Sequence, residues 1–154
     1  MQYHIFGWRR VLVGTLLVLT VLFFTSKLTI AQAESLSFDE MYASASAYGY
    51  TYTDKLLGLA GKKVTMVGYM APPLKPTINF FVLTAVPMSV CPFCSTDADW
   101  PDNIIVVKLP SAVTALPYDS PVSVTGTLEV GSEVDEETGF ISQVRINATD
   151  VSAI

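Results

Sequence analysis

Histidine and cysteine are scarce in this sequence. The only histidine is His4, and the only two cysteines are Cys91 and Cys94. His4 lies in an N-terminal stretch with the features of a removable export signal, described below, so the mature chain has no imidazole. This excludes a Ser-His-Asp triad, a Cys-His nucleophile and a histidine-bound metal.

Positive charge is also in short supply. The chain has nine Lys and Arg residues against fourteen Asp and Glu. Three of the basic residues, Arg9, Arg10 and Lys27, lie within the first 33 positions, and all of the acidic residues lie beyond them. The mature chain therefore has a net charge of about −8 and no basic stripe, which argues against a nucleic-acid partner, because phosphate binding depends on Lys and Arg.

The N-terminus has the order of a secretory signal. Arg9 and Arg10 precede fourteen uncharged residues, VLVGTLLVLTVLFF, and AQA follows at 31–33. A helix of fourteen residues spans roughly 21 Å, which is short for a hydrocarbon core of about 30 Å. We expect residues 1–33 to be a signal peptide cleaved after Ala33, with a periplasmic or secreted product and no stable membrane insertion. An uncleaved anchor is the alternative.

Residues 34–61 form an N-terminal helical and aromatic segment. Ser37 and Glu40 have the spacing of a capping box, which predicts a short helix. A second short helix is expected over 54–60, ending at Gly61. The side chains expected to line one face of the first helix are Phe38, Met41, Tyr42 and Ala45. An extended segment is expected where tyrosines alternate, at Tyr48, Tyr50 and Tyr52. We expect these rings to cover the edge of the core with their hydroxyls in water, and an aromatic contact surface is the alternative.

In residues 62–154, apolar side chains recur at every second position, as they do in β-strands. Five strands are predicted over 63–70, 79–86, 103–109, 121–130 and 140–146, and 110–117 has room for one helical turn. In the fourth strand, the side chains expected to face the core are Val122, Val124, Gly126, Leu128 and Val130. The fold class is mainly β: a five-stranded, partly open OB-like barrel preceded by a short helical segment. A five-stranded sandwich is the alternative.

The same residues carry a resemblance. LLGLAGKKVTMVGYMAPP, FFVLT, the cysteine-containing loop and VSVTGTLEVG resemble a group of small exported bacterial proteins of uncharacterised function with a predicted OB-like fold. The likeness extends from Leu56 to Val151. It implies a periplasmic accessory or binding role with a periplasmic or membrane protein as partner, linked in some relatives to metal uptake, and it brings no catalytic residues.

The segment SVCPFCSTDADWPD, residues 89–102, contains the remaining candidate residues for metal binding or redox chemistry. In an oxidising compartment Cys91 and Cys94 would close as a disulfide, which across four residues stabilises the fold by only about 2 kcal/mol. A second interpretation is a metal site for zinc or copper, in which the two thiolates are joined by the carboxylates of Asp97 and Asp99.

Redox catalysis is the third interpretation of the pair. A thioredoxin-like Cys-x-x-Cys motif needs a helix N-terminus to lower the pKa of its first thiol, whereas STDADWPDN is a poor helix whose acids would raise it. We therefore expect a noncatalytic periplasmic accessory or binding module, with metal handling through Cys91 and Cys94 as an open possibility. The alternative is a thiol-disulfide oxidoreductase that uses both cysteines.

Overall fold

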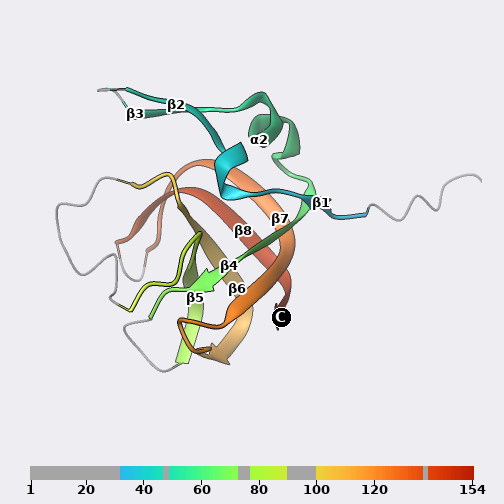
Figure 1. The fold of residues 1–154 in the computed structure, drawn as a ribbon, viewed down its shortest axis with the longest axis vertical. Helices are drawn as coiled ribbons and strands as arrows, with labels where there is room; N and C mark the ends of the chain where they lie inside the picture. Colours follow the sequence, from blue (N-terminus) through green and yellow to red (C-terminus); the bar gives the residue numbers. More distant parts are fainter. Residues whose placement is uncertain (1–31, 47–48, 73–76, 90–99, 137–138) are drawn as a thin grey trace, which may run out of the picture. The chain divides into compact units, whose positions relative to one another are not determined.

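The computed structural model describes residues 32–46, 49–72, 77–89, 100–136 and 139–154. Eight strands, one α-helix and one 3-10 helix are formed by these residues (Figure 1). In chain order they are β1 (Glu34–Ser35), η1 (Phe38–Glu40), β2 (Tyr42–Ser46), β3 (Gly49–Tyr52), α2 (Asp54–Leu59), β4 (Lys63–Met70), β5 (Thr77–Thr84), β6 (Ile104–Thr114), β7 (Pro121–Val134) and β8 (Ile141–Ala153).

The main sheet closes on itself. Its strand order is β1-β4-β5-β6-β8-β7, and β7 pairs again with β4, so β4 to β8 form a closed ring of five strands. All neighbours in this ring are antiparallel except β6 and β8, which run parallel. Figure 1 shows the strands curving around a common interior. This mainly β architecture, with a partly closed sheet, is consistent with an OB-like fold.

The five predicted strands are all present, but three of them extend further than the period-two pattern indicated. The helical turn predicted over 110–117 is wrong, because β6 continues to Thr114. The backbone of Val113 and Thr114 pairs with Ile78 and Thr77 of β5. Pairing across the sheet satisfies the polar groups of this backbone, which a single helical turn would leave largely unpaired.

The predicted alternation in β7 is confirmed. Val122, Val124 and Leu128 are fully buried, whereas the non-glycine residues between them are half-buried. Val130, the last residue predicted to face inward, is half-buried and packs against the core. Gly126 is also buried, and the β7–β8 register shifts between Thr125 and Gly126. A glycine at such an irregularity lets one strand bend closely over its neighbour.

The N-terminal segment differs from the prediction. The capping box at Ser37 is present, since the Ser37 amide donates to Glu40 Oε2 over 3.0 Å, but the helix it opens is only the three-residue η1. The predicted helical face that included Tyr42 and Ala45 is wrong, because Tyr42–Ser46 is strand β2, paired antiparallel with β3. Gly49, with φ +107, begins β3, and a backbone in that region favours glycine.

The second predicted helix is found as α2, one residue shorter than expected. Thr53 caps it, accepting a hydrogen bond from the Leu56 amide over 3.1 Å, and Gly61 follows with φ +76. Tyr50 and Tyr52 lie in the extended strand β3, as their alternation indicated. Tyr48 lies outside the described residues.

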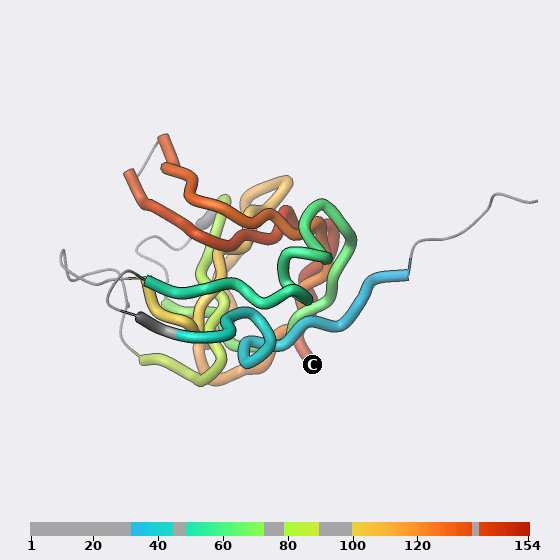
Figure 2. Tube along the Cα trace, turned by 90° about the horizontal axis from the view of Figure 1, so that it is seen from above, coloured from blue at the N-terminus to red at the C-terminus, as the bar shows by residue number. Residues whose placement is uncertain are grey.

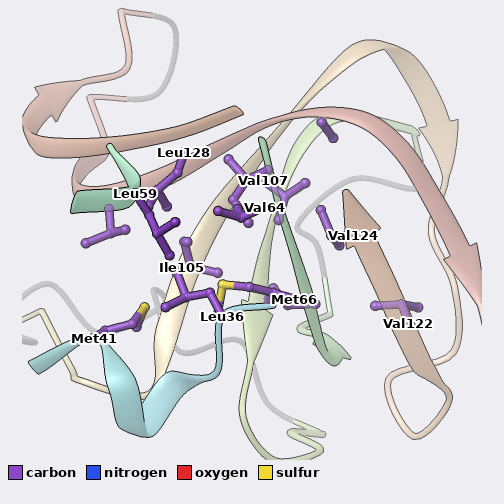
Figure 3. Packing of buried hydrophobic residues seen from close by; sticks show 14 of the residues in the cluster. Leu36, Met41, Leu59, Val64, Met66, Ile105, Val107, Val122, Val124 and Leu128 are labelled. Atoms are coloured by element: carbon purple, nitrogen blue, oxygen red, sulfur yellow. The ribbon is translucent and has the colours of Figure 1, made fainter. Parts of the chain in front are cut away.

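The core fills the ring of strands and receives side chains from the N-terminal segment. Figure 3 shows Leu36, Met41 and Leu59 pointing toward Met66 and Ile105. Leu36 and Met41 are at most 1% exposed. The segment before β4 therefore belongs to the hydrophobic core, where burying a side chain of this size stabilises a fold by about 1.5–3 kcal/mol.

Within the described ranges, no helix has both the length and the apolar character needed to cross a membrane.

Candidate functional site

The predicted metal ligands fall in the connection between β5 and β6, which runs from residue 85 to 103. Cys91, Cys94, Asp97 and Asp99 lie within 90–99, outside the described residues. Among the residues that the structure does describe, no three Cys, His, Asp or Glu side chains gather as a metal site would require. The metal, disulfide and redox interpretations of the cysteine pair therefore stay predictions.

The base of this connection is well defined. The Ala85 amide donates to the carbonyl of Asn103 over 3.0 Å, which joins the two ends of the connection. The buried hydroxyl of Thr84 lies 2.7 Å from the carbonyl oxygen of Val86 and 3.2 Å from that of Tyr69. These bonds fix the two described ends of the connection, at Thr84–Val86 and Asn103, on the barrel.

Trp100 links that segment to two other parts of the chain. Its indole Nε1 donates a hydrogen bond to the hydroxyl of Tyr42, on β2, over 2.9 Å. Its ring also lies 6.2 Å, centroid to centroid, from that of Phe140, in the connection between β7 and β8. In both views the β2–β3 hairpin and the tip of the β7–β8 hairpin extend toward the same side of the barrel (Figures 1 and 2).

Further aromatic rings continue this contact in both directions. The ring centroid of Tyr42 lies 4.9 Å from that of Tyr50 and 5.7 Å from that of Tyr52. At the other end, Phe140 stacks on Phe80 of β5 at 6.4 Å. We call this set of six the aromatic row: Tyr50, Tyr52, Tyr42, Trp100, Phe140 and Phe80.

Burial governs the acid–base behaviour of the row. The pKa of Tyr42 is raised from 10.0 to about 12, mainly because the ring is removed from water, and the hydrogen bond from Trp100 opposes this. The neighbouring Tyr52, Asp102 and Tyr50 raise the pKa of Tyr42 further. Burial also raises the pKa of Tyr52. Both phenols are therefore neutral at physiological pH and suit binding better than proton transfer.

The outer face of β5 and β6 is covered as well. Val82, Ile104 and Val106 are at most 4% exposed, although they alternate with residues that point into the barrel. Phe80, Trp100 and Phe140 pack against them and form a second, smaller apolar cluster. In OB folds this face of the second and third barrel strands, here β5 and β6, commonly receives the ligand.

Next to this cluster lies a network of charged side chains. Arg145 of β8 is only 5% exposed and its Nε lies 3.3 Å from Glu129 Oε2 and 3.1 Å from Glu133 Oε2. Its Nη1 donates to the carbonyl oxygens of Gly131, at 2.7 Å, and Ser142, at 3.1 Å. Lys108 forms a short ion pair with Glu133. The hydrogen bond from Lys108 is the main reason that the pKa of Glu133 is lowered.

This network leaves little unpaired positive charge at Lys108 and Arg145 for an anionic ligand. The cations of Lys108 and Arg145 are both neutralised by carboxylates of β7. Binding a nucleic-acid strand depends on cations that can pair with phosphates. The absence of a nucleic-acid partner stays a prediction from the sequence.

Sequence reasoning missed most of the aromatic row. It favoured the tyrosines as cover for the edge of the core over an aromatic contact surface and gave Trp100 no role, although Trp100 is the only tryptophan beyond residue 33. The uninterrupted apolar runs FFVL and IIVV were the available signal, because strands buried on both faces lose their alternation. Those runs indicate that something covers the outer face of β5 and β6.

The fold and the row together define a class of protein: a small, mainly β protein of OB-like architecture with an aromatic surface at one end. No family model matches the chain, and no curated protein matches it.

Among solved structures, the chain is similar to the crystal structure of a DUF3299 family protein from Pseudomonas aeruginosa PAO1. The TM-score is 0.52 at 16% sequence identity, and the match covers 80% of this chain and 97% of that one. At this identity the likeness concerns the fold alone.

A second match is the small single-stranded DNA-binding protein from Streptomyces coelicolor, at 17% identity over 60% of this chain and 93% of that one. Its TM-score of 0.31 is too low for any conclusion about this protein.

Proposed function

We propose that this protein is a noncatalytic binding module that acts in the periplasm or after secretion. In this proposal the chain is exported, cleaved after Ala33, and binds a periplasmic or membrane protein through the aromatic row and the cysteine-containing connection beside it. Export rests on the order of charge, apolar run and small residues at the N-terminus.

One observation carries the proposal. Trp100, the first described residue after the cysteine segment, contacts both Tyr42 and Phe140. Strand β2 and two connections, which are distant from one another in the sequence, thus come together through aromatic rings. Aromatic side chains of this kind supply much of the energy of protein–protein contacts, because they offer large contact areas and a polar tip.

The acid–base state of the described side chains supports binding over catalysis. The phenols of Tyr42 and Tyr52 have raised pKa values, which removes them as bases at neutral pH. Glu133, in the ionic network, has a lowered pKa and pairs with Lys108 and Arg145. A general acid or base works best with a pKa near the working pH, and none of these groups has one.

Cys91 and Cys94 have a supporting place in the proposal. They shape the connection next to Trp100, either as a disulfide or as ligands that hold zinc or copper with Asp97 and Asp99. The same segment would be the reactive part of the alternative, a thiol-disulfide oxidoreductase.

Site-specific photo-crosslinking in cells tests the binding role. A photoreactive amino acid replaces Tyr50, which is 37% exposed in the row, or Val67, which is 55% exposed on β4 and serves as the control. We expect position 50 to give a discrete crosslinked protein and position 67 to give none. Equal crosslinking from both positions, or none from either, would contradict binding through the row.

Thiol chemistry separates the proposal from the enzymatic alternative. Free thiols are titrated in the purified protein, bound zinc and copper are measured, and reduction of a small disulfide substrate is followed with the wild type and with Cys91→Ser. We expect no turnover above the uncatalysed rate in either protein. Turnover by the wild type that disappears in Cys91→Ser would establish the oxidoreductase instead.

A further inference from the structure

Three tyrosines of the β2–β3 hairpin form the exposed end of the aromatic row. Tyr50 and Tyr52 are two residues apart on β3 and therefore share one face of the strand. Tyr42 of β2 is the register partner of Tyr52. The rings of Tyr42 and Tyr50 are tilted by 48° with their centroids 4.9 Å apart, so part of the π surface of this group faces outward through the exposed Tyr50.

The carboxylate of Asp102 lies near these rings. Asp102 is exposed and lies two residues beyond Trp100, whose indole is hydrogen-bonded to Tyr42. It is close enough to Tyr42 for its negative charge to help raise the pKa of that phenol. Between described residues, no ion pair includes Asp102. We call Tyr42, Tyr50, Tyr52 and Asp102 the tyrosine patch.

We propose that the tyrosine patch binds the cationic side chain of an arginine or lysine in the partner protein. This inference rests on the proposed binding function and names the chemistry of its partner. The face of an aromatic ring attracts a cation, and a neighbouring carboxylate adds a direct charge contact. Arginine suits the patch better than lysine, because its planar guanidinium stacks on rings while its edge donates to a carboxylate.

Charge complementarity favours a cation over other occupants. The chain beyond residue 33 has a net charge of about −8, so an anionic partner would be repelled. The charge of Arg145 lowers the pKa of Tyr52 against the larger effect of burial, but that charge is balanced by contacts with Glu129 and Glu133. Lys55 and Lys108 are likewise paired within the chain, with Glu40 and Glu133. None of these three cations is therefore available to the patch, and in this proposal the cation comes from another molecule.

A peptide titration tests this inference directly. The probe is an acetylated and amidated Gly-Arg-Gly-Arg-Gly peptide, and its control is the same peptide with citrulline, which keeps the shape of arginine without the charge. Binding to the purified protein is followed by NMR chemical shifts of the tyrosine rings and the Asp102 amide. We expect the arginine peptide to shift these signals, the citrulline peptide to leave them unchanged, and added salt to weaken the effect.

Matched variants locate the site. Tyr50→Leu should weaken binding of the arginine peptide by about two- to fivefold, the range of one exposed cation–π contact. Asp102→Asn, which removes an exposed charge contact, should weaken it by up to about fivefold. Tyr118→Leu and Asp119→Asn are the controls, because this exposed tyrosine and its neighbouring aspartate lie in the turn between β6 and β7. Both controls should bind like the wild type.

Several results would overturn the inference: equal binding of the citrulline peptide, shifts confined to other surfaces, or equal losses in the control variants. Absence of binding by the arginine peptide would also overturn it. If position 50 nevertheless crosslinks to a discrete protein, the binding function stands and only the cationic partner is wrong. If both experiments are negative, the proposed function fails as well.

Discussion

Among the described glycines, Gly126 has the least room for an added side chain. A Cβ placed on it would lie 2.2 Å from the backbone oxygen of Asn147 and 2.7 Å from the Cα of Ala148. Ordinary contacts of a Cβ begin at 3.4 Å, so the alanine variant needs a displacement of more than 1 Å. The obstacle is the backbone of β8, which is held by β6 on one side and β7 on the other.

We therefore expect Gly126→Ala to lower the free energy of unfolding by about 3 kcal/mol or more, the upper part of the usual range for overpacking. Gly58→Ala is the matched control, because Gly58 lies in α2 with no atom within 4 Å of its added Cβ. It should stabilise the protein by roughly 0.5–1 kcal/mol, since alanine forms helices better than glycine.

Urea denaturation followed by tryptophan fluorescence measures both variants. The midpoint should fall for Gly126→Ala and rise for Gly58→Ala, while the slope of free energy against urea concentration stays constant. At about 4 °C per kcal/mol for a domain of this size, the melting temperature of Gly126→Ala should fall by roughly 12 °C. A variant within about 1 kcal/mol of the wild type would refute the close crossing of β7 over β8.

Three further predictions concern the core, the ionic network and the N-terminus. Leu128→Ala should lower the free energy of unfolding by about 2–4 kcal/mol and Thr125→Ala by less than about 1 kcal/mol, because only Leu128 is fully buried; equal losses in denaturant midpoints would refute the alternation in β7. Because folding lowers the pKa of Glu133, its stabilisation is complete above the ordinary value of 4.5 and is lost as pH falls through the folded value. Urea midpoints between pH 6 and 3 should therefore fall more steeply in the wild type than in Glu133→Gln, and parallel curves would contradict this. Mass spectrometry of the fractionated protein should find a chain that begins at Glu34, whereas a full-length species in the membrane would favour the uncleaved anchor.

Local patterns predicted the barrel well where one face of a strand is buried. The alternation from Val122 to Leu128 matches the burial in the structure, and β4 has the predicted bounds. Glycine and proline marked most strand starts, because these residues favour turns. The ends of the last three strands were missed. Beyond the core, pairing with the neighbouring strand decides how far a strand extends, and the periodicity of one strand carries no information about its neighbour.

In the N-terminal segment the helix cap was predicted correctly, but the length of the helix after it was not. Ser37 and Glu40 do form their capping contacts, but a cap determines only where a helix begins. Tyr42 lies opposite Tyr52 in the β2–β3 hairpin, and its ring contacts two other tyrosines. Such cross-strand contacts between rings stabilise a hairpin and outweigh a weak helix preference.

The sequence predicted which kinds of residue belong to the candidate site, but not that they lie close together. The sequence indicated the cysteine segment and the tyrosines as separate features, because nothing in their spacing shows that Trp100 reaches Tyr42. That contact joins residues 58 positions apart in the chain. It depends on how the separate two-stranded sheet of β2 and β3 packs beside the barrel, which the spacing of residues does not contain.

The burial of the β5–β6 face also bears on where a partner would bind. In OB folds this face commonly receives extended ligands, but here Val82, Ile104 and Val106 are covered in part by Trp100 and Phe140. A ligand on that face would have to displace both rings and expose apolar surface worth about 25 cal/mol per Å². The tyrosine patch needs no such displacement, because Tyr50 and Asp102 are already exposed. Binding at the end of the barrel is therefore favoured over binding across its face.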